Sequence, residues 1–413
     1  MTTASGALGV GLVGAGGFAT FLAAAISDLP GLRLDAVTDA DAERAMLLAS
    51  RHDAAVVRNS DALLARDSVD VVVIATPPGQ HASLAVAALA AGRHVFCEKP
   101  LAVTVAGADR VADAVAASGR VLVVDHVLRY NPLLRVITEL RDTGLLGPVQ
   151  RFAFENDAAD EDLPDGHWFW DDTHSGGILI EHGVHFFDAA SMIIGSEPER
   201  VQALGFRRDG GTLDSVVATA SHPGGASASY AHGFTHAHRA ERQLMRIDFG
   251  TAEARVHGWI PLRAELDIWT DDAGAARLET LGERGGQLFE VPGYRRGGDE
   301  SVTAAIERSA GSPRAIGRGR AHRVPHHARV DLTLAAPSGK QRVYAASVRA
   351  AMADLMHCAV TGDRPAAGVD AGRRAVRTAA AATEALHDGR THDVPPADQL
   401  PGNRSSGGFR ASS

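Results

Sequence analysis

The sequence predicts an α/β protein with a doubly wound parallel sheet, followed by an α/β domain built on a large open, mainly antiparallel sheet. Three observations support this fold class. A glycine-rich turn follows the first apolar strand, and apolar strands alternate with helical patterns up to about residue 129. Beyond that point short strands recur without crossover helices between them, which is typical of antiparallel pairing.

The first strand, Leu8 to Val13, leads into the turn Gly14-Ala15-Gly16-Gly17-Phe18-Ala19 and an Ala-rich helix. This is the GxGxxA form of the dinucleotide-binding fingerprint of a Rossmann domain. Gly14 permits the tight turn, Gly16 lets a pyrophosphate approach the backbone, and Ala19 allows close packing of helix on strand. We expect five residues of the turn to bind a dinucleotide: Gly14, Gly16, Gly17, Phe18 and Ala19.

The second strand, Leu32 to Thr38, ends at Asp39, where an acidic residue is expected to meet the adenosine ribose hydroxyls. A carboxylate there repels a 2′-phosphate, so Asp39 predicts NAD, with NADP as the other possible cofactor. An alternative is that Asp39 caps the helix that starts near Ala42. The two roles are compatible.

The central crossover begins with Val69 to Ala75, an apolar run without alternation, as in a strand buried on both faces. Thr76 to Gly79 ends it, a helix covers residues 81–91, and a second strand, His94 to Cys97, runs into Glu98-Lys99-Pro100. Both strands end at the edge where open α/β sheets bind ligands. Lys99 has restricted backbone freedom before a proline and can present a cation to a ligand hydroxyl. The alternative is a surface lysine in a turn.

A helix from Val103 to Ala117 and a strand from Arg120 to Val124 complete this domain. We place the domain boundary near Arg129, which gives a Rossmann domain at 1–129 and a substrate-binding and oligomerisation domain at 130–400. The Ser- and Gly-rich end, 401–413, is expected to be disordered.

Gly176 and Gly177 are expected to open one helix that carries Glu181, His182, His185 and Asp188. Glu181, His185 and Asp188 share a face by their spacing. A histidine with a carboxylate one turn away is an acid–base arrangement. Two alternatives stay open: a zinc site built from His182, His185 and a carboxylate, and a solvent-facing helix.

The stretch 156–175 is acidic and then aromatic, and we expect a long surface loop. Its Trp168 suits a polyhydroxylated ligand, although packing of these aromatics against the core is the alternative. Residues 201–334 are expected to be β-rich, and 282–325 have no assignment. The expected strands are Val149–Glu155, Val201–Phe206, Ser215–Ser221, Ser227–His232, Leu244–Phe249, Glu253–Val256, Ala264–Trp269 and Arg329–Leu334, followed by helices Arg342–Thr361 and Ala371–His387.

The bulk composition is that of a soluble globular protein, with 413 residues, 45% of them hydrophobic and 22% charged. A net charge of -9 argues against nucleic acid and anionic membranes as partners. The two cysteines, Cys97 and Cys358, lie far apart, which favours a reducing compartment. We find no apolar run that we expect to span a bilayer and predict a cytoplasmic protein.

Four motifs together resemble the Gfo/Idh/MocA family of nicotinamide-dependent oxidoreductases: the N-terminal GxGxxA, the block from TPP to EKP, the RYNP exit and SGGILIEHGVHFFD. The resemblance implies that Lys99 is the active-site lysine and His185 the catalytic histidine. It also implies that Glu98 and His81 line the nicotinamide ribose and that Thr76 and Pro77 contact the cofactor through their backbone. In such proteins the open sheet commonly forms the oligomer interface, so a homodimer or homotetramer is expected.

We therefore predict an oxidoreductase that transfers hydride between NAD and a secondary hydroxyl of a sugar, cyclitol or sugar derivative. The catalytic residues are Lys99, His185 and Glu181, with Glu181 orienting or charging His185, and no metal is needed. Substrate contacts are expected from Arg129, Tyr130 and Trp168 as well. One alternative is redox-neutral glycoside cleavage, in which oxidation and elimination restore the cofactor. Another is a non-catalytic cofactor-binding regulator, which would not require Lys99 and His185 to be present.

Overall fold

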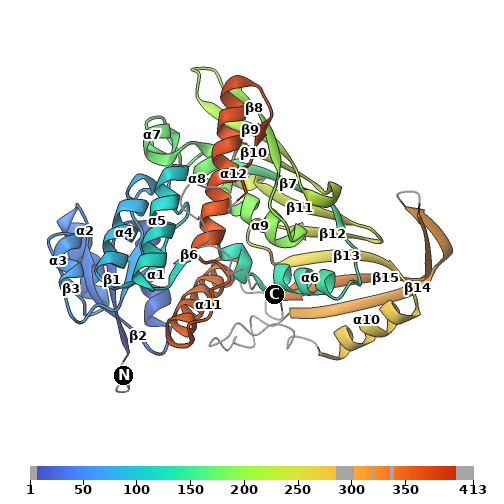
Figure 1. Ribbon diagram of the computed structural model, residues 1–413, viewed down its shortest axis with the longest axis horizontal. Helices are drawn as coiled ribbons and strands as arrows, with labels where there is room; N and C mark the ends of the chain where they lie inside the picture. Colours follow the sequence, from blue (N-terminus) through green and yellow to red (C-terminus); the bar gives the residue numbers. More distant parts are fainter. Residues whose placement is uncertain (1–6, 285–301, 318–319, 335–338, 397–413) are drawn as a thin grey trace, which may run out of the picture.

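The computed structural model consists of two sheets, with helices packed on both faces of the first and on one face of the second (Figure 1). It describes residues 7–284, 302–317, 320–334 and 339–396. The expected disordered tail lies outside the described residues.

The N-terminal sheet has six strands, and every pairing in it is parallel. The strand order reverses on either side of the first strand, which confirms the predicted doubly wound topology. In spatial order the strands are β3 (Ala55–Val56), β2 (Leu32–Thr38), β1 (Leu8–Val13), β4 (Val71–Ile74), β5 (His94–Cys97) and β6 (Leu122–Val124).

Burial on both faces explains why these strands show no alternation in the sequence. Val71 and Val73 of β4 belong to one hydrophobic cluster, whereas Val72 and Ile74 belong to another on the opposite face. Each of the two clusters also contains side chains of the helices that pack on that face of the sheet. The helices of this domain are α1 (Gly17–Ser27), α2 (Ala42–Arg51), α3 (Ser60–Leu64), α4 (His81–Ala90) and α5 (Val105–Ser118), with single turns η1 (Pro78–Gln80) and η2 (Val127–Tyr130).

The second sheet has ten strands and is antiparallel except for the β7–β10 pair, as the sequence predicts for a mainly antiparallel sheet. In spatial order it contains β14 (Val302–Gly317), β15 (Arg320–Leu334), β13 (Arg263–Thr270), β12 (Ala252–His257), β11 (Arg242–Phe249), β7 (Val149–Ala159), β10 (Ser227–His236), β9 (Leu213–Ser221), β8 (Arg200–Arg207) and β16 (His392–Asp393).

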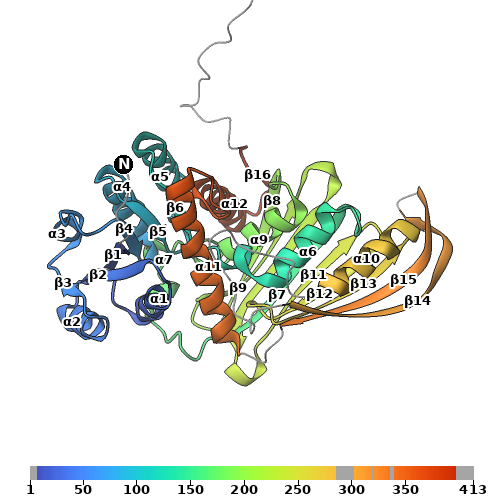
Figure 2. The same ribbon diagram turned by 90° about the horizontal axis from the view of Figure 1, so that it is seen from below.

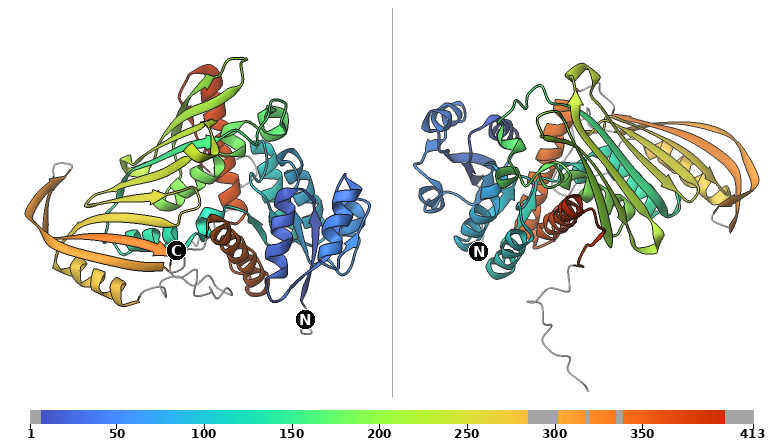
Figure 3. Two further views of the ribbon diagram at one scale, coloured as in Figure 1. Left: turned by 180° about the vertical axis from the view of Figure 1, so that it is seen from behind. Right: turned by 90° about the horizontal axis from the view of Figure 1, so that it is seen from above.

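Helices cover one face of this sheet, and among the described residues none covers the other (Figures 2 and 3). The covered face forms the largest hydrophobic cluster of the protein. The elements of this domain that are not strands are α6 (Pro132–Asp142), η3 (Trp168–Trp170), α7 (Asp172–Ser175), α8 (Ile178–Glu181), α9 (Val184–Ile194), η4 (Pro223–Gly225), η5 (His238–Ala240), α10 (Asp272–Arg284), α11 (Lys340–Thr361) and α12 (Val369–Asp388).

The sequence analysis did not predict two elements of this domain. Helix α10 lies in a region expected to be β-rich, and β14 lies in the unassigned stretch 282–325, of which residues 285–301 and 318–319 are outside the described part of the chain. Strand β15 begins at Arg320, well before the predicted Arg329. Long-range pairing with β14 extends it, and a local pattern does not report such pairing.

Helix α11 comes from the C-terminal part of the chain but packs against α1 and the Rossmann strands, so the predicted span 130–400 contributes a helix to the N-terminal core. Its Val343 and Met352 share a cluster with Val10 and Leu12 of β1. Helix α12 packs against α5 on one side and α8 and α9 on the other, and both helices stand between the two sheets (Figure 1).

The segment Asp172–Ile194 is long and apolar enough to cross a membrane, contrary to our expectation that no such run exists. However, 72% of its most apolar stretch is buried inside the protein, and the segment is divided among α7, α8 and α9. We therefore interpret it as part of the core.

Candidate active site

The glycine-rich turn has the shape of a cradle for a dinucleotide. Gly14 has a φ of +105°, and a Cβ there would collide with the carbonyl oxygen of Ala75, so only glycine fits. A Cβ on Gly16 or Gly17 would meet no protein atom within 4 Å. Nor does a side chain cap the N-terminus of α1, and its first turn carries no acidic residue. The backbone N–H groups of this end are thus available to a pyrophosphate, and the residues present fit a bound NAD.

Asp39 ties the second strand to this turn. One carboxylate oxygen accepts a hydrogen bond from the backbone N of Ala15 at 2.6 Å, and the other accepts from the backbone N of Asp41 at 2.7 Å. The N-cap of α2 is Asp41, whose side chain accepts from Glu43 and Arg44, so the alternative that Asp39 caps this helix is wrong. The half-buried carboxylate of Asp39 stands at the end of β2, as an adenosine-binding role requires.

Lys99 and Glu181 form an ion pair between the two domains. Lys99 Nζ donates to Glu181 Oε1 at 2.5 Å and to the main-chain oxygen of Glu181 at 2.9 Å. The side chains are only 15% and 12% exposed, so the alternative of a surface lysine in a turn is wrong. Lys99 follows β5 at the carboxyl edge of the parallel sheet, and Glu181 ends helix α8 of the second domain. The pair therefore fixes a cation at the edge where ligands bind.

The structure contradicts the prediction that Glu181 orients His185. The expected single helix is divided into α8 and α9 around His182 and Gly183, and Glu181 turns to Lys99 instead. His185 is 5% exposed, and its Nδ1 is buried without a hydrogen-bond partner among the described residues. Burial, and after it the positive charge of Lys99, lower the pKa of His185 well below its ordinary value. His185 is therefore a neutral imidazole beside a fixed cation at neutral pH.

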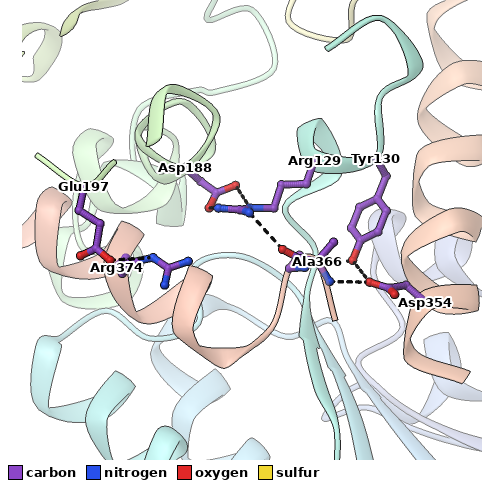
Figure 4. Close-up of polar contacts among 8 residues, drawn as sticks. Arg129, Tyr130, Asp188, Glu197, Asp354, Ala366 and Arg374 are labelled. Carbon is purple, nitrogen blue, oxygen red and sulfur yellow. Dashed lines mark hydrogen bonds and ion pairs between the residues drawn. The ribbon is translucent and has the colours of Figure 1, made fainter. Parts of the chain in front are cut away.

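Asp188, the third polar residue of the predicted helix face, pairs with Arg129 (Figure 4). Arg129 Nε lies 2.7 Å from Asp188 Oδ2, and Arg129 also donates to the main-chain oxygen of Ala366. Burial opposes ionisation of Asp188, yet the guanidinium of Arg129 keeps the pKa of this carboxyl below its usual value. This ion pair anchors α9 one turn beyond His185.

Tyr130 is also committed to internal contacts. Its hydroxyl donates to Asp354 Oδ2 at 2.7 Å and accepts from the backbone N of Ala367, and the residue is 1% exposed (Figure 4). Protein groups thus engage the polar side-chain atoms of Arg129 and Tyr130 that these contacts involve. Their role as substrate contacts stays a prediction.

His81 also makes internal contacts. Its ring nitrogens lie 2.7 Å from the Pro100 oxygen and 2.8 Å from the Thr76 oxygen, and the ring is buried. These contacts join Thr76 to the Lys99–Pro100 segment, and a contact of His81 with the ribose stays a prediction. Thr76 Oγ1 and Glu98 Oε1 are buried without partners among the described residues, and both remain predicted cofactor contacts, as does Pro77.

The aromatic stretch near Trp168 divides between core and surface. Phe169 is buried and packs edge-to-face on Phe234, as the core alternative predicts, whereas Trp168 is 39% exposed. Trp168 remains a predicted substrate contact. The structure adds Trp259, which the sequence analysis did not find: its ring lies 5.9 Å from that of His185 and 5.2 Å from that of Tyr344. No sequence motif marks this residue, because it lies in the connection after β12.

Two further groups near Lys99 were also missed. Asp125 and His126, each 1% exposed, directly follow β6. No N–H or hydroxyl group of the described residues donates to the Asp125 carboxyl, and neither ring nitrogen of His126 has a hydrogen-bond partner among them. The His126 ring lies 6.3 Å from that of His185. Among the described residues no group of three His, Cys, Asp or Glu is arranged to hold a metal ion, so the zinc alternative at His182 and His185 lacks a third ligand there.

Two models of the GFO/IDH/MocA oxidoreductases match the chain. The model described as the oxidoreductase family with an NAD-binding Rossmann fold matches residues 8–126. The model of the C-terminal domain of the same family matches residues 134–258. Together they include Lys99, Glu181 and His185.

Individual relatives agree with these matches. The chain is 29% identical over 198 residues to a 2,7-anhydro-N-acetylneuraminate hydratase of Mediterraneibacter gnavus, covering 48% of this chain and 52% of that protein. It is 33% identical over 205 residues to an inositol 2-dehydrogenase of Acidothermus cellulolyticus, covering 48% and 57%. The chain thus spans about half the length of these curated relatives.

A solved oxidoreductase from Agrobacterium radiobacter, in complex with NAD+, L-tartaric acid and magnesium, shares the fold. Its TM-score is 0.70 at 18% identity, and the superposition covers 94% of this chain and 98% of that one.

We predict that the protein prefers NAD to NADP, because the Asp39 carboxylate repels a 2′-phosphate at the end of β2. The measurement is kcat/KM with each cofactor. The variant Asp39→Asn removes the negative charge and should reduce the preference for NAD over NADP. The control Asp53→Asn removes an exposed carboxylate between α2 and β3 and should leave the preference unchanged. Equal or better use of NADP by the unaltered protein would contradict the role of Asp39.

Proposed function

Because the chain belongs to the Gfo/Idh/MocA family of NAD(P)-dependent oxidoreductases, we propose that it oxidises or forms a secondary hydroxyl on a sugar, cyclitol or sugar derivative. The main observation in support of this proposal is the ion pair between Lys99 and Glu181 of the second domain. An ammonium at the ligand-binding edge of the Rossmann sheet lies beside a buried, neutral histidine of the other domain.

The roles of the two residues follow from their environments. Bound NAD would accept the hydride at C4 of its nicotinamide, which is chemistry that the cofactor supplies. His185, neutral because of its burial, can accept the hydroxyl proton of the alcohol. Lys99, held by two oxygens of Glu181, offers a positive charge where an alkoxide develops. In the reductive direction the same groups return the proton to the new hydroxyl.

One observation favours a second function. The relative from Mediterraneibacter gnavus is a hydratase, and a family member that restores its cofactor within each cycle would use the same lysine and histidine. Redox-neutral cleavage or hydration of a glycoside is therefore the alternative reaction. Net formation of NADH separates the two, because only the dehydrogenase accumulates it. The third possibility, a non-catalytic regulator, is disfavoured by the presence of both Lys99 and His185.

We further infer a homo-oligomer in the cytoplasm. The uncovered face and edge of the second sheet expose large apolar side chains, including Leu204, Phe206 and Trp269, which suits contact with another copy. Cys97 and Cys358 are both buried and unpaired, in agreement with a reducing compartment.

We predict that Lys99→Ala lowers kcat by about 10²- to 10³-fold, the usual loss on removing one preorganised electrostatic group. NAD should still bind, because the pyrophosphate is held at the glycine-rich turn. The assays are turnover on a panel of sugars and cyclitols and NAD binding by calorimetry. The control is Arg110→Ala, which removes an exposed cation from α5. Near-normal turnover of Lys99→Ala would defeat the proposed function.

We predict that His185→Asn loses about 10²- to 10⁴-fold in kcat/KM for alcohol oxidation. In the unaltered protein the rate should fall on acidification, as His185 takes up a proton and can no longer accept one. Because burial and Lys99 lower its pKa, this fall should lie below pH 6.5, the ordinary pKa of histidine.

The measurement is the pH profile of kcat/KM, which should lose its acid limb in His185→Asn. The matched control is His222→Asn, since the pKa of His222 is also lowered by burial, to about 4, but this residue lies against Ser196. If the acid limb persists in His185→Asn, the group that accepts the proton is not His185 but another residue. Inactivation by a chelator would revive the metal alternative.

A further inference from the structure

Glu98 and Asp125 form a pair of carboxyl groups at the carboxyl edge of the Rossmann sheet. They directly follow the neighbouring strands β5 and β6, which are in register, and the backbone N of Asp125 donates to the Cys97 oxygen at 2.8 Å. Glu98 is 8% and Asp125 1% exposed. Two buried carboxyl groups are thus placed side by side, next to Lys99.

No described donor reaches either side-chain oxygen of Asp125. The side chains of Glu98 and Asp125 lie within hydrogen-bonding reach of each other, and a carboxyl group can donate only when it is protonated. Burial and the negative charge of Asp125 raise the pKa of Glu98 well above its ordinary value. Burial also raises the pKa of Asp125, but only to about 6, since the hydrogen bond from Glu98 and the charge of Lys99 oppose it. At neutral pH the pair therefore holds one proton, which favours Glu98, and one negative charge.

The other charged groups around the pair balance one another in number. The positive charge of Lys99 is matched by the negative charge of Glu181, and that of Arg129 by the negative charge of Asp188. Burial lowers the pKa of His126 and of His185, so both rings are neutral. The other groups that face the pair, the Cys97 thiol and the Tyr344 phenol, have pKa values raised by burial and then by these carboxylates, so they are neutral too. The net charge of these groups together is therefore about −1.

We propose that the buried pair of Asp125 and Glu98 sets the redox preference of the site by favouring the positively charged nicotinamide of NAD+ over the neutral ring of NADH. In a doubly wound sheet the dinucleotide binds across the carboxyl edge of the strands. A nicotinamide that reaches Lys99 after β5 would therefore also lie near Asp125, which follows the neighbouring strand β6. A buried carboxylate there attracts a cationic ring through a medium of low dielectric constant. The consequence is that hydride transfer from the bound cofactor to a carbonyl becomes more favourable.

The test compares dissociation constants of NAD+ and NADH, which needs no turnover. We expect Asp125→Asn to shift the ratio Kd(NAD+)/Kd(NADH) by roughly 10- to 100-fold toward NADH, because the pair is then neutral. Glu98→Gln should keep the ratio within about threefold, a shift under 1 kcal/mol, since the amide still donates to an ionised Asp125. A contact of Glu98 with the ribose, if lost in this variant, changes both dissociation constants alike and leaves their ratio. The distant control Asp113→Asn, exposed on α5, should behave as the unaltered protein does.

The proposal is overturned if Asp125→Asn keeps the ratio of the unaltered protein, or if Glu98→Gln shifts it as far as Asp125→Asn does. A second measurement requires only Glu98→Gln and the unaltered protein. Infrared spectra at pH 7.5 should show the carbonyl stretch of a protonated carboxyl group that is missing in Glu98→Gln. Absence of this band from the unaltered protein would equally refute the shared proton.

Discussion

The ion pair of Lys99 with Glu181 is the contact on which the site depends. The two residues are 82 positions apart, come from different domains and lose most of their exposure where they meet. Removing water from two charges is costly unless they are paired and hydrogen-bonded, and here the lysine has both a carboxylate and a main-chain oxygen. Any movement that separates the domains would leave a half-buried charge on each side. The pair thus links the catalytic geometry to the packing of the domains.

The local backbone around Glu181 is built to make this contact. Gly177, with a φ of +83°, precedes the short helix α8, and Gly183 follows it. A Cβ on Gly183 would meet the Leu179 oxygen at 2.5 Å, so the chain can pack this closely only with glycine there. The resulting break turns Glu181 toward Lys99 and leaves His185 on α9 without a carboxylate partner. The segment that contains α8 and α9 therefore supplies two groups with separate roles. Glu181 orients the ammonium of Lys99, and His185 is an uncharged base.

A second set of polar contacts holds α9 in place from behind. Arg129 joins Asp188 to the main chain at Ala366, and Tyr130 joins the same loop to Asp354 of α11 (Figure 4). Together with the packing of α11 on α1, these contacts make the C-terminal helices part of the Rossmann domain's framework. The carboxyl group of Asp125 and the ammonium of Lys99 then lie on neighbouring strand ends whose positions this framework fixes.

The parts of the structure that follow local rules could be predicted from the sequence. Strands β1 and β2 have the predicted bounds, and the turn at Gly14 and the end of β5 at Lys99 follow from strand, helix and turn patterns. The partners of Glu181, Arg129 and Tyr130 could not be predicted, because they lie 82, 59 and 224 residues away. The helical spacing of Glu181 and His185 was misleading, because the chain forms two helices, α8 and α9, that are separated at His182 and Gly183. Strand β14 was missed because its pairing with β15 defines it.

The central claim is that Glu181 acts through Lys99 and not through His185, and a double-mutant cycle on kcat tests it most directly. Glu181→Gln is measured alone, with Lys99→Met and with His185→Asn. The account predicts that Glu181→Gln slows the otherwise unaltered enzyme and the His185→Asn variant but adds no loss to Lys99→Met. If its effect persisted without Lys99 and vanished in His185→Asn, Glu181 would serve the histidine, and the account would be contradicted.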